Sequence, residues 1–266
     1  MKIEVQSSPN FNARKHPIDM LVFHYTGMET GQEALTRMCD PEAEVSAHYM
    51  VWEDGRVVQL VGEDKRAWHA GVASWQGDQD LNSRSIGIEI VNGGHDWPLA
   101  GDVLPPYPNA QIEALIELSK GILERWDVPF NRIVGHSDIA PPRKADPGEH
   151  FPWDRLARAG VGKWPLSISE HPAVPPDLMT TGQALEKGPH LIGRGLGPGD
   201  SKKAVARMQG MLSGIGYALE ETGVYDAATE AVIRAFQRRW LQDQVTGWAD
   251  IRTLRMIGLV TPLFLQ

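Results

Sequence analysis

The sequence contains a single cysteine, Cys39, so no disulfide can form within the chain. Cys39 lies among apolar residues of a predicted short helix, where we expect a buried, unreactive thiol. No run of about 18 apolar residues occurs, which excludes a membrane-spanning helix. The start of the chain lacks the apolar segment of a secretory signal. We therefore expect a cytoplasmic protein, or a periplasmic or envelope protein whose leader has been removed.

Positive charge is also scarce: the sequence has 26 Lys and Arg but 34 Asp and Glu, which gives a net charge of −8. Nucleic-acid-binding proteins usually carry a basic surface, so we expect no nucleic-acid partner. The HExxH helix of the commonest zinc proteases is missing as well. The 266 residues are otherwise of ordinary globular composition, with 42% hydrophobic and 23% charged residues. This length permits one large domain and one small domain.

Strand-like and helix-like segments alternate over residues 1–165. Strands are expected at residues 18–25, 85–91 and 130–136, a hairpin around Asp54-Gly55, and helices at residues 31–39 and from Pro108 to just before Pro129. Strands interleaved with helices pack as a sheet covered by helices. The sequence therefore predicts an α/β domain with a mixed central sheet flanked by helices.

The character of the chain changes after Trp164. Residues 166–190 are rich in Pro, Ser and Thr without periodicity, and we expect a linker there. Residues 191–266 predict a small all-α domain of three helices, the last with Ile251, Leu254 and Ile257 on its apolar face. A short unit recurs in it after 24 residues: Thr222-Gly223, Asp226 and Thr229 reappear as Thr246-Gly247, Asp250 and Thr253. Glycine permits the turn and aspartate caps the next helix, so one helical unit is used twice.

Two histidines end predicted strands, His24 in the first and His136 in the last. Strand ends line the ligand crevice of open α/β sheets. Asp146 follows His136 by ten residues, in a loop that three prolines stiffen. Two histidines and one carboxylate match a catalytic zinc site that leaves a fourth position for water. The spacing by itself leaves structural roles open for all three.

Glu89 lies within an otherwise apolar strand, where a carboxylate is costly unless it is paired or functional. Strand alternation places Ser85, Gly87 and Glu89 on one face, and these small neighbours would leave room for a substrate. Lys144 lies two residues before Asp146 and could place a cation beside a developing oxyanion. The alternatives are an edge glutamate and a solvated loop lysine.

Together these motifs resemble the type 2 N-acetylmuramoyl-L-alanine amidases, zinc enzymes related to peptidoglycan-recognition proteins. The matching segments are VFHYTG at His24, VSAHYMVWEDGRVVQLV, AWHAG at Trp68, NSRSIGIEI around Glu89 and VGHSDIAPPRKADPG at His136. They occur in the family's order and cover residues 8 to 165. The tail, from VARMQGMLSGIGY to TGWADIRTL, is similar to the three-helix peptidoglycan-binding domain often attached to such enzymes.

The resemblance implies hydrolysis of the amide between N-acetylmuramic acid and L-alanine, in peptidoglycan or in soluble anhydro-muropeptides. It places one Zn²⁺ per chain on His24, His136 and Asp146, and the catalytic residues on Glu89 and Lys144. Glu89 would move the proton and Lys144 would share the oxyanion charge. The implied substrate contacts are Trp68, His69, Asn82 and Arg143. His48 also lies in a motif, but its half-buried strand favours a structural or groove-wall role.

Three alternatives remain open at this point. The first is a non-catalytic recognition protein of the same fold, although none of the catalytic positions is lost. The second is a zinc peptidase that acts on the peptide cross-links. The third concerns the tail alone, since three short helices could be a helix-turn-helix that binds DNA. From Asp200 onward, however, eight Lys and Arg face seven Asp and Glu, which is poor support for phosphate binding.

The expected second domain also suggests a role in substrate capture. A weak second binding site on a linker raises the local concentration of a polymeric substrate. We therefore expect the tail to matter more for intact cell wall than for small soluble muropeptides.

Overall fold

A computed structural model describes residues 1–165 and 195–264 of the chain. The predicted linker at 166–190 and the predicted start of the second domain at 191 lie outside these residues. The strands are β1 (Ile3–Val5), β2 (Phe11–Ala13), β3 (Met20–Tyr25), β4 (Tyr49–Val51), β5 (Val57–Gln59), β6 (Lys65–Ala67), β7 (Ser85–Ile90) and β8 (Ile133–Gly135). The helices are α1 (Gly31–Cys39), α2 (Leu81–Arg84), α3 (Asn109–Arg125), α4 (His136–Ile139), α5 (Trp153–Arg158), α7 (Lys203–Ile215), α8 (Ala227–Trp240) and α9 (Ile251–Phe264), with 3₁₀ turns η1 (Pro41–Ala43) and η2 (Phe130–Arg132).

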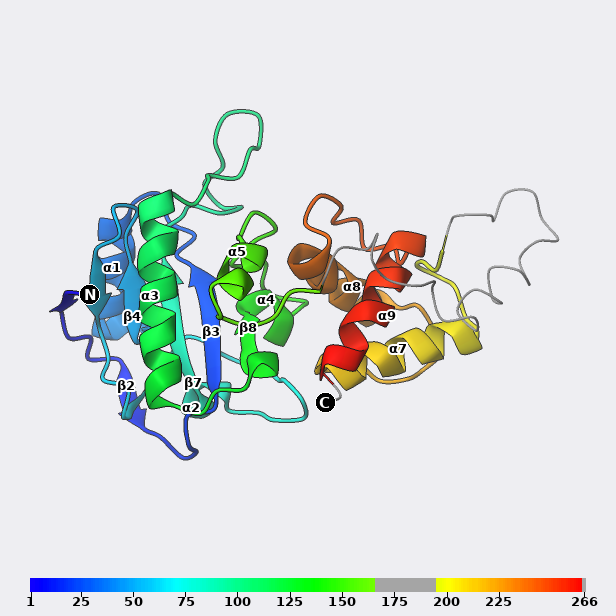
Figure 1. Cartoon of the computed structure of the whole chain (residues 1–266), viewed down its shortest axis with the longest axis horizontal. Coiled ribbons are helices and arrows are strands. Elements are labelled where there is room, and N and C mark those ends of the chain that lie inside the picture. Colours follow the sequence, from blue (N-terminus) through cyan, green and yellow to red (C-terminus); the bar gives the residue numbers. More distant parts are fainter. Residues whose placement is uncertain (166–194, 265–266) are drawn as a thin grey trace.

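Six strands form one mixed sheet in the order β1-β5-β4-β7-β3-β8. All of its neighbouring pairs are parallel except the β4–β5 hairpin, whose turn is at Asp54-Gly55 as predicted. Strands β2 and β6 pair separately as an antiparallel ribbon. The α/β prediction is thus confirmed, and α3 lies along one face of the sheet (Figure 1).

The two central strands divide their side chains between the two faces of the sheet. Ile86, Ile88 and Ile90 of β7 pack in one cluster with α3 residues such as Leu115. Alternation then turns Ser85, Gly87 and Glu89 to the opposite face, as expected. In β3 the same alternation sends Leu21 and Phe23 toward α3, and Met20 and Val22 toward the other face. His24 continues the second set at the carboxyl end of its strand.

Two local predictions were wrong, and one held only in part. Residues 130–136 are not one strand, since a 3₁₀ turn over Phe130–Arg132 precedes the three residues of β8. Ile251 was expected in the apolar face of the last helix, but it is 41% exposed because it is that helix's first residue. Cys39 is half-buried rather than buried, at the end of α1, although burial still raises the pKa of its thiol.

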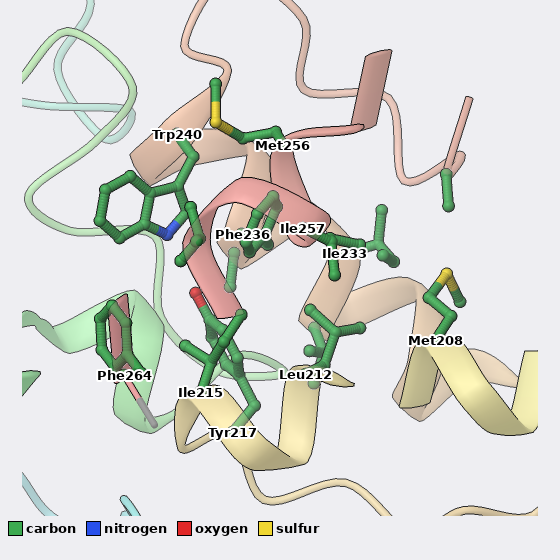
Figure 2. Packing of buried hydrophobic residues seen from close by; sticks show 14 of the residues in the cluster. Met208, Leu212, Ile215, Tyr217, Ile233, Phe236, Trp240, Met256, Ile257 and Phe264 are labelled. Atoms are coloured by element: carbon green, nitrogen blue, oxygen red, sulfur yellow. The ribbon is translucent and has the colours of Figure 1, made fainter. Parts of the chain in front are cut away.

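The C-terminal domain consists of α7, α8 and α9, whose apolar side chains converge on a common core (Figure 2). Its internal repeat is visible in the hydrogen bonds. Asp226 and Asp250 each cap the next helix by accepting the N–H three residues later, from Thr229 and Thr253. A buried glutamine completes each unit: Gln209 binds the Gly223 turn and Gln237 binds the Gly247 turn. The repeat predicted from the sequence is therefore structural, but the two glutamines were missed.

His48 is completely buried, and its ring holds the backbone between β4 and β7. Its Nδ1 accepts the N–H of Gly87 at 2.9 Å, and its Nε2 lies 3.1 Å from the carbonyl of Lys65. Burial, with the nearby charge of Arg14, lowers the pKa of His48 to about 3. The structural role considered for His48 fits this position.

Because of this lowered pKa, His48 makes the free energy of unfolding depend on pH. Above pH about 6.5, His48 is neutral in both the folded and the unfolded chain. As the pH falls from there toward 3, only the unfolded chain gains the proton, so stability is lost over that window. The full loss of unfolding free energy over this window is on the order of 5 kcal/mol. In urea titrations, we expect His48→Gln to lose less stability than wild type between pH 6.5 and 4. The exposed His16→Gln is the control, and parallel curves for wild type and His48→Gln would contradict the assignment.

Candidate active site

The two histidines predicted as metal ligands meet because their strands are parallel neighbours. β3 pairs with β8 so that Phe23 lies opposite Gly135, which places His24 and His136 at the same edge of the sheet. Asp146 is brought to this edge by its own backbone, whose carbonyl accepts the N–H of Ser137 at 2.8 Å. All three side chains are buried.

Their ligand atoms converge to hydrogen-bond distance. Nδ1 of His24 lies 2.9 Å from Nδ1 of His136 and 3.0 Å from Oδ2 of Asp146. Nδ1 of His136 lies 3.1 Å from the same oxygen. In a tetrahedral zinc site with bonds of about 2.0–2.1 Å, ligand atoms lie about 3.3 Å apart. The sequence prediction that these three residues share one place is therefore met.

The outer hydrogen bonds decide which ring nitrogens carry protons. The hydroxyl of Ser85 donates to the carbonyl of Leu81, so its oxygen accepts from Nε2 of His69 at 3.1 Å. Nδ1 of His69 then accepts from Nε2 of His24 at 3.0 Å. This order leaves a lone pair on Nδ1 of His24, which points at the ligand cluster.

His136 adopts the same tautomer. Its Nε2 donates to the carbonyl of Ala70 at 3.0 Å, which leaves a lone pair on its Nδ1. Burial lowers the pKa of His24 to about 4, so its ring stays neutral. Two lone pairs and a carboxylate thus face one another, an arrangement that a divalent cation completes.

Glu89 stands beside this cluster, since β7 pairs with β3 so that Glu89 lies opposite His24. Burial raises the pKa of its carboxyl well above the usual value, and Asp146 adds to the rise while Lys144 opposes it. Its Oε2 is buried and accepts no hydrogen bond from the described residues. A carboxyl group so placed can exchange a proton with a bound reactant.

A pocket of about 510 Å³ opens over these groups. Its lining includes Trp68, Arg143 and Lys144 from the predicted set. Trp68 donates from its indole to Asn12 at 3.2 Å, while Arg143 binds the carbonyls of Ala70 and Val72. These three stay candidates for contact with a reactant.

His69 and Asn82, which were expected to touch substrate, both make hydrogen bonds that build the site, although His69 also lines the pocket. His69 is only 8% exposed, and both of its ring nitrogens are engaged within the protein. Its ring also fills the space over Gly87, where an added Cβ would lie 2.4 Å from the ring. The room expected there for a substrate is therefore occupied. The side chain of Asn82 accepts the N–H groups of His69 and Ala70 and lies outside the pocket lining.

The remaining wall of the pocket was not predicted from the sequence. It includes Tyr25, Arg37, His95 and Asp96. His95 accepts the hydroxyl of Tyr25 at 3.0 Å, and its other nitrogen lies 3.1 Å from Glu149. Tyr25 directly follows His24, which was a usable signal. His95 and Asp96 lie in a loop without periodicity, so no pattern pointed to them.

Comparisons with known proteins agree with this site. The family model of N-acetylmuramoyl-L-alanine amidases matches residues 14–149, and that of a peptidoglycan binding domain matches residues 201–257. N-acetylmuramoyl-L-alanine amidase AmiD of Escherichia coli (strain K12) is 33% identical over 240 residues, covering 85% of this chain and 84% of its own. 1,6-anhydro-N-acetylmuramyl-L-alanine amidase AmpD of Enterobacter cloacae is 39% identical over 154 residues, covering 52% of this chain and 78% of its own.

Solved structures show the same similarity over nearly the whole chain. The complex of E. coli AmiD with anhydro-N-acetylmuramic acid-L-Ala-D-gamma-Glu-L-Lys matches with a TM-score of 0.72 and 32% identity, covering 94% of this chain and 90% of that chain. AmpDh3 from Pseudomonas aeruginosa matches with a TM-score of 0.73 and 31% identity, covering 98% and 96%. The buried His-His-Asp cluster, the adjacent glutamate and these matches agree, and the chain belongs to the N-acetylmuramoyl-L-alanine amidase family, as an enzyme with a C-terminal peptidoglycan-binding domain.

Proposed function

We propose that this enzyme hydrolyses the amide between the lactyl group of N-acetylmuramic acid and L-alanine, with one zinc ion held by His24, His136 and Asp146. The observation that carries this proposal is the pair of Nδ1 lone pairs facing one buried carboxylate. When bound, a zinc ion at such a site lowers the pKa of a water molecule and polarises a carbonyl group. Neutral nitrogen ligands and a carboxylate suit this ion.

The substrate class follows from the relatives. E. coli AmiD is in complex with an anhydro-muramyl tripeptide and P. aeruginosa AmpDh3 with anhydromuramic pentapeptide. We propose soluble anhydro-muropeptides as substrates of this chain, and peptidoglycan as a second substrate because of the C-terminal domain. The described helices include none long and apolar enough to cross a membrane.

Glu89 is the proposed proton carrier. Its raised pKa allows it to take the proton of the attacking water and hand it to the leaving nitrogen of L-alanine. Lys144 is the proposed partner of the negative charge that develops on the amide oxygen, because its side chain lines the same pocket. Arg143 and Trp68 are proposed to bind the substrate beside them.

The bond that is cut can be identified directly. Incubation with an anhydro-muramyl tripeptide should release a peptide with a free L-alanine amino group and an intact anhydro sugar, as seen by mass spectrometry. Removing metal with a chelator should abolish release, and one equivalent of zinc should restore it. Fragments cut within the peptide would support a peptidase instead, and binding without any product would support a recognition protein.

Glu89→Gln removes the proton carrier and preserves the shape of the side chain. We expect turnover of the anhydro-muramyl tripeptide to fall by about 10²–10⁴-fold, the usual share of general acid–base catalysis. Zinc content, measured by elemental analysis, should stay at one per chain. Glu113→Gln on the exposed side of α3 is the matched control. Activity close to wild type in Glu89→Gln would rule out this role.

Lys144→Ala removes the proposed oxyanion partner. Loss of one such group typically slows turnover by about 10²–10³-fold. The zinc content should not change, because Lys144 supplies no ligand atom. Lys120→Ala on α3 controls for the loss of one positive charge. A purely solvated Lys144 would instead leave kcat unchanged.

A further inference from the structure

The C-terminal domain packs against the catalytic domain through a buried contact. The rings of Trp75 and Tyr217 lie 5.1 Å apart and belong to one continuous core cluster. The N–H of Gln76 donates to the carbonyl of Gly216 at 2.9 Å, and Gln242 donates to the carbonyl of Phe151 at 2.6 Å. Figure 1 shows α8 beside α4 and α5. The two domains thus share a core, whereas a domain joined only by a linker would make no such contact.

An ion pair lies inside this contact. Asp138 of α4 is 1% exposed and Arg239 of α8 is 3% exposed. Arg239 donates to Oδ2 of Asp138 at 2.8 Å, and the hydroxyl of Tyr217 donates to Oδ1 at 2.8 Å. The guanidinium of Arg239 also lies 4.4 Å from the ring of Trp153 and donates to the carbonyl of Ile133. Each charge is therefore compensated only while the two domains stay in contact.

Asp138 belongs to the same short turn as the ligand His136. Its Oδ2 accepts the N–H of Gly135 at 2.9 Å, directly before His136. The N–H of Ser137 in this turn holds the carbonyl of Asp146. The carboxylate of Asp138 thus fixes the turn that carries one ligand and anchors another. Arg239 and Tyr217 in turn fix this carboxylate.

The neighbouring arginine of α8 pairs with Glu149, a residue that supports the pocket wall at His95. Nε of Arg238 lies 3.8 Å from Oε2 of Glu149, which lies 3.1 Å from His95. His95 binds the hydroxyl of Tyr25, and both line the pocket. Two consecutive residues of one helix therefore contact the supports of two sides of the active site.

We propose that the C-terminal domain is a positioning element of the catalytic centre, in which Arg239 and Tyr217 hold His136 in place through Asp138. This goes beyond binding of the cell wall, and it rests on the proposed zinc site. Partners that orient metal ligands typically change metal affinity by about 10–100-fold when removed. Arg239 acts through Asp138 and touches no reactant, so its effect should be seen in metal binding as well as in turnover.

The test uses the full-length chain. In Arg239→Met, Asp138 is left as an uncompensated buried charge and the turn can shift. We expect zinc affinity, measured by competition with a chelator, to fall by about 10–100-fold. kcat on a soluble anhydro-muramyl tripeptide should fall more than KM changes. Circular dichroism at the assay temperature verifies that the variant is folded. Arg234→Met is the matched control, because Arg234 lies on the same helix and pairs with Glu230 inside the C-terminal domain.

A second substitution separates positioning from general damage. In the double variant Asp138→Asn with Arg239→Met, the amide oxygen can still accept the N–H of Gly135 and no buried charge is left. Part of the lost zinc affinity should return. Tyr217→Phe removes one hydroxyl only and keeps the inference testable if Arg239→Met fails to fold, and a several-fold loss of affinity is expected.

The outcomes are distinct. Folded Arg239→Met or Tyr217→Phe with wild-type zinc affinity would overturn the positioning role, while wild-type cleavage of the amide would leave the proposed function intact. A wild-type chain that binds zinc but releases no peptide would overturn the proposed function alone. Equal loss of affinity in Arg234→Met would also refute the positioning role, because the effect would then follow from any lost ion pair of α8.

Discussion

Three acceptor atoms forced together in a buried place are the constraint on which the rest of the molecule depends. The nitrogens of His24 and His136 and an oxygen of Asp146 lie about 3 Å apart, and all three side chains are buried. Without a cation, lone pairs and a negative charge would repel one another there. The protein holds them by rigid means: two adjacent parallel strands supply the histidines, and a backbone hydrogen bond supplies the aspartate. The central sheet and its covering helix α3 can be understood as the frame for this convergence.

The protonation of the site is set from outside it. A serine hydroxyl anchored on a helix carbonyl fixes the tautomer of His69, which fixes that of His24, and a second carbonyl does the same for His136. Both imidazoles thereby present a lone pair on Nδ1, the form in which an imidazole can bind a metal ion. Gly87 is needed for this chain of hydrogen bonds, because only a residue without a side chain leaves space for the ring of His69. A strand glycine that suggested an open substrate face is therefore a close-packing position.

Much of the fold and of the candidate site could be predicted from the sequence, and the predictions that failed did so for physical reasons. Alternation in residues 85–91 predicted which face Glu89 occupies, because a period of two is a local property of strands. The family motifs predicted that His24, His136 and Asp146 come together, and the structure brings them together. The engagement of His69 could not be foreseen, because its partners Ser85 and His24 lie 16 and 45 residues away. The pair Arg239–Asp138 joins residues 101 apart, and neither shows any local pattern. Long-range polar contacts leave no periodic trace in a sequence.

The docked C-terminal domain changes how binding and cleavage are related. A domain on a free linker raises the local concentration of substrate, and that advantage declines as the linker lengthens. A domain held by a shared core and a buried ion pair presents its surface at one fixed angle to the catalytic pocket. Under the proposed function, productive contact with a polymer then depends on whether the polymer fits that geometry. Relatives of AmpD type match only about half of this chain, so the docked C-terminal domain is a point of difference from them.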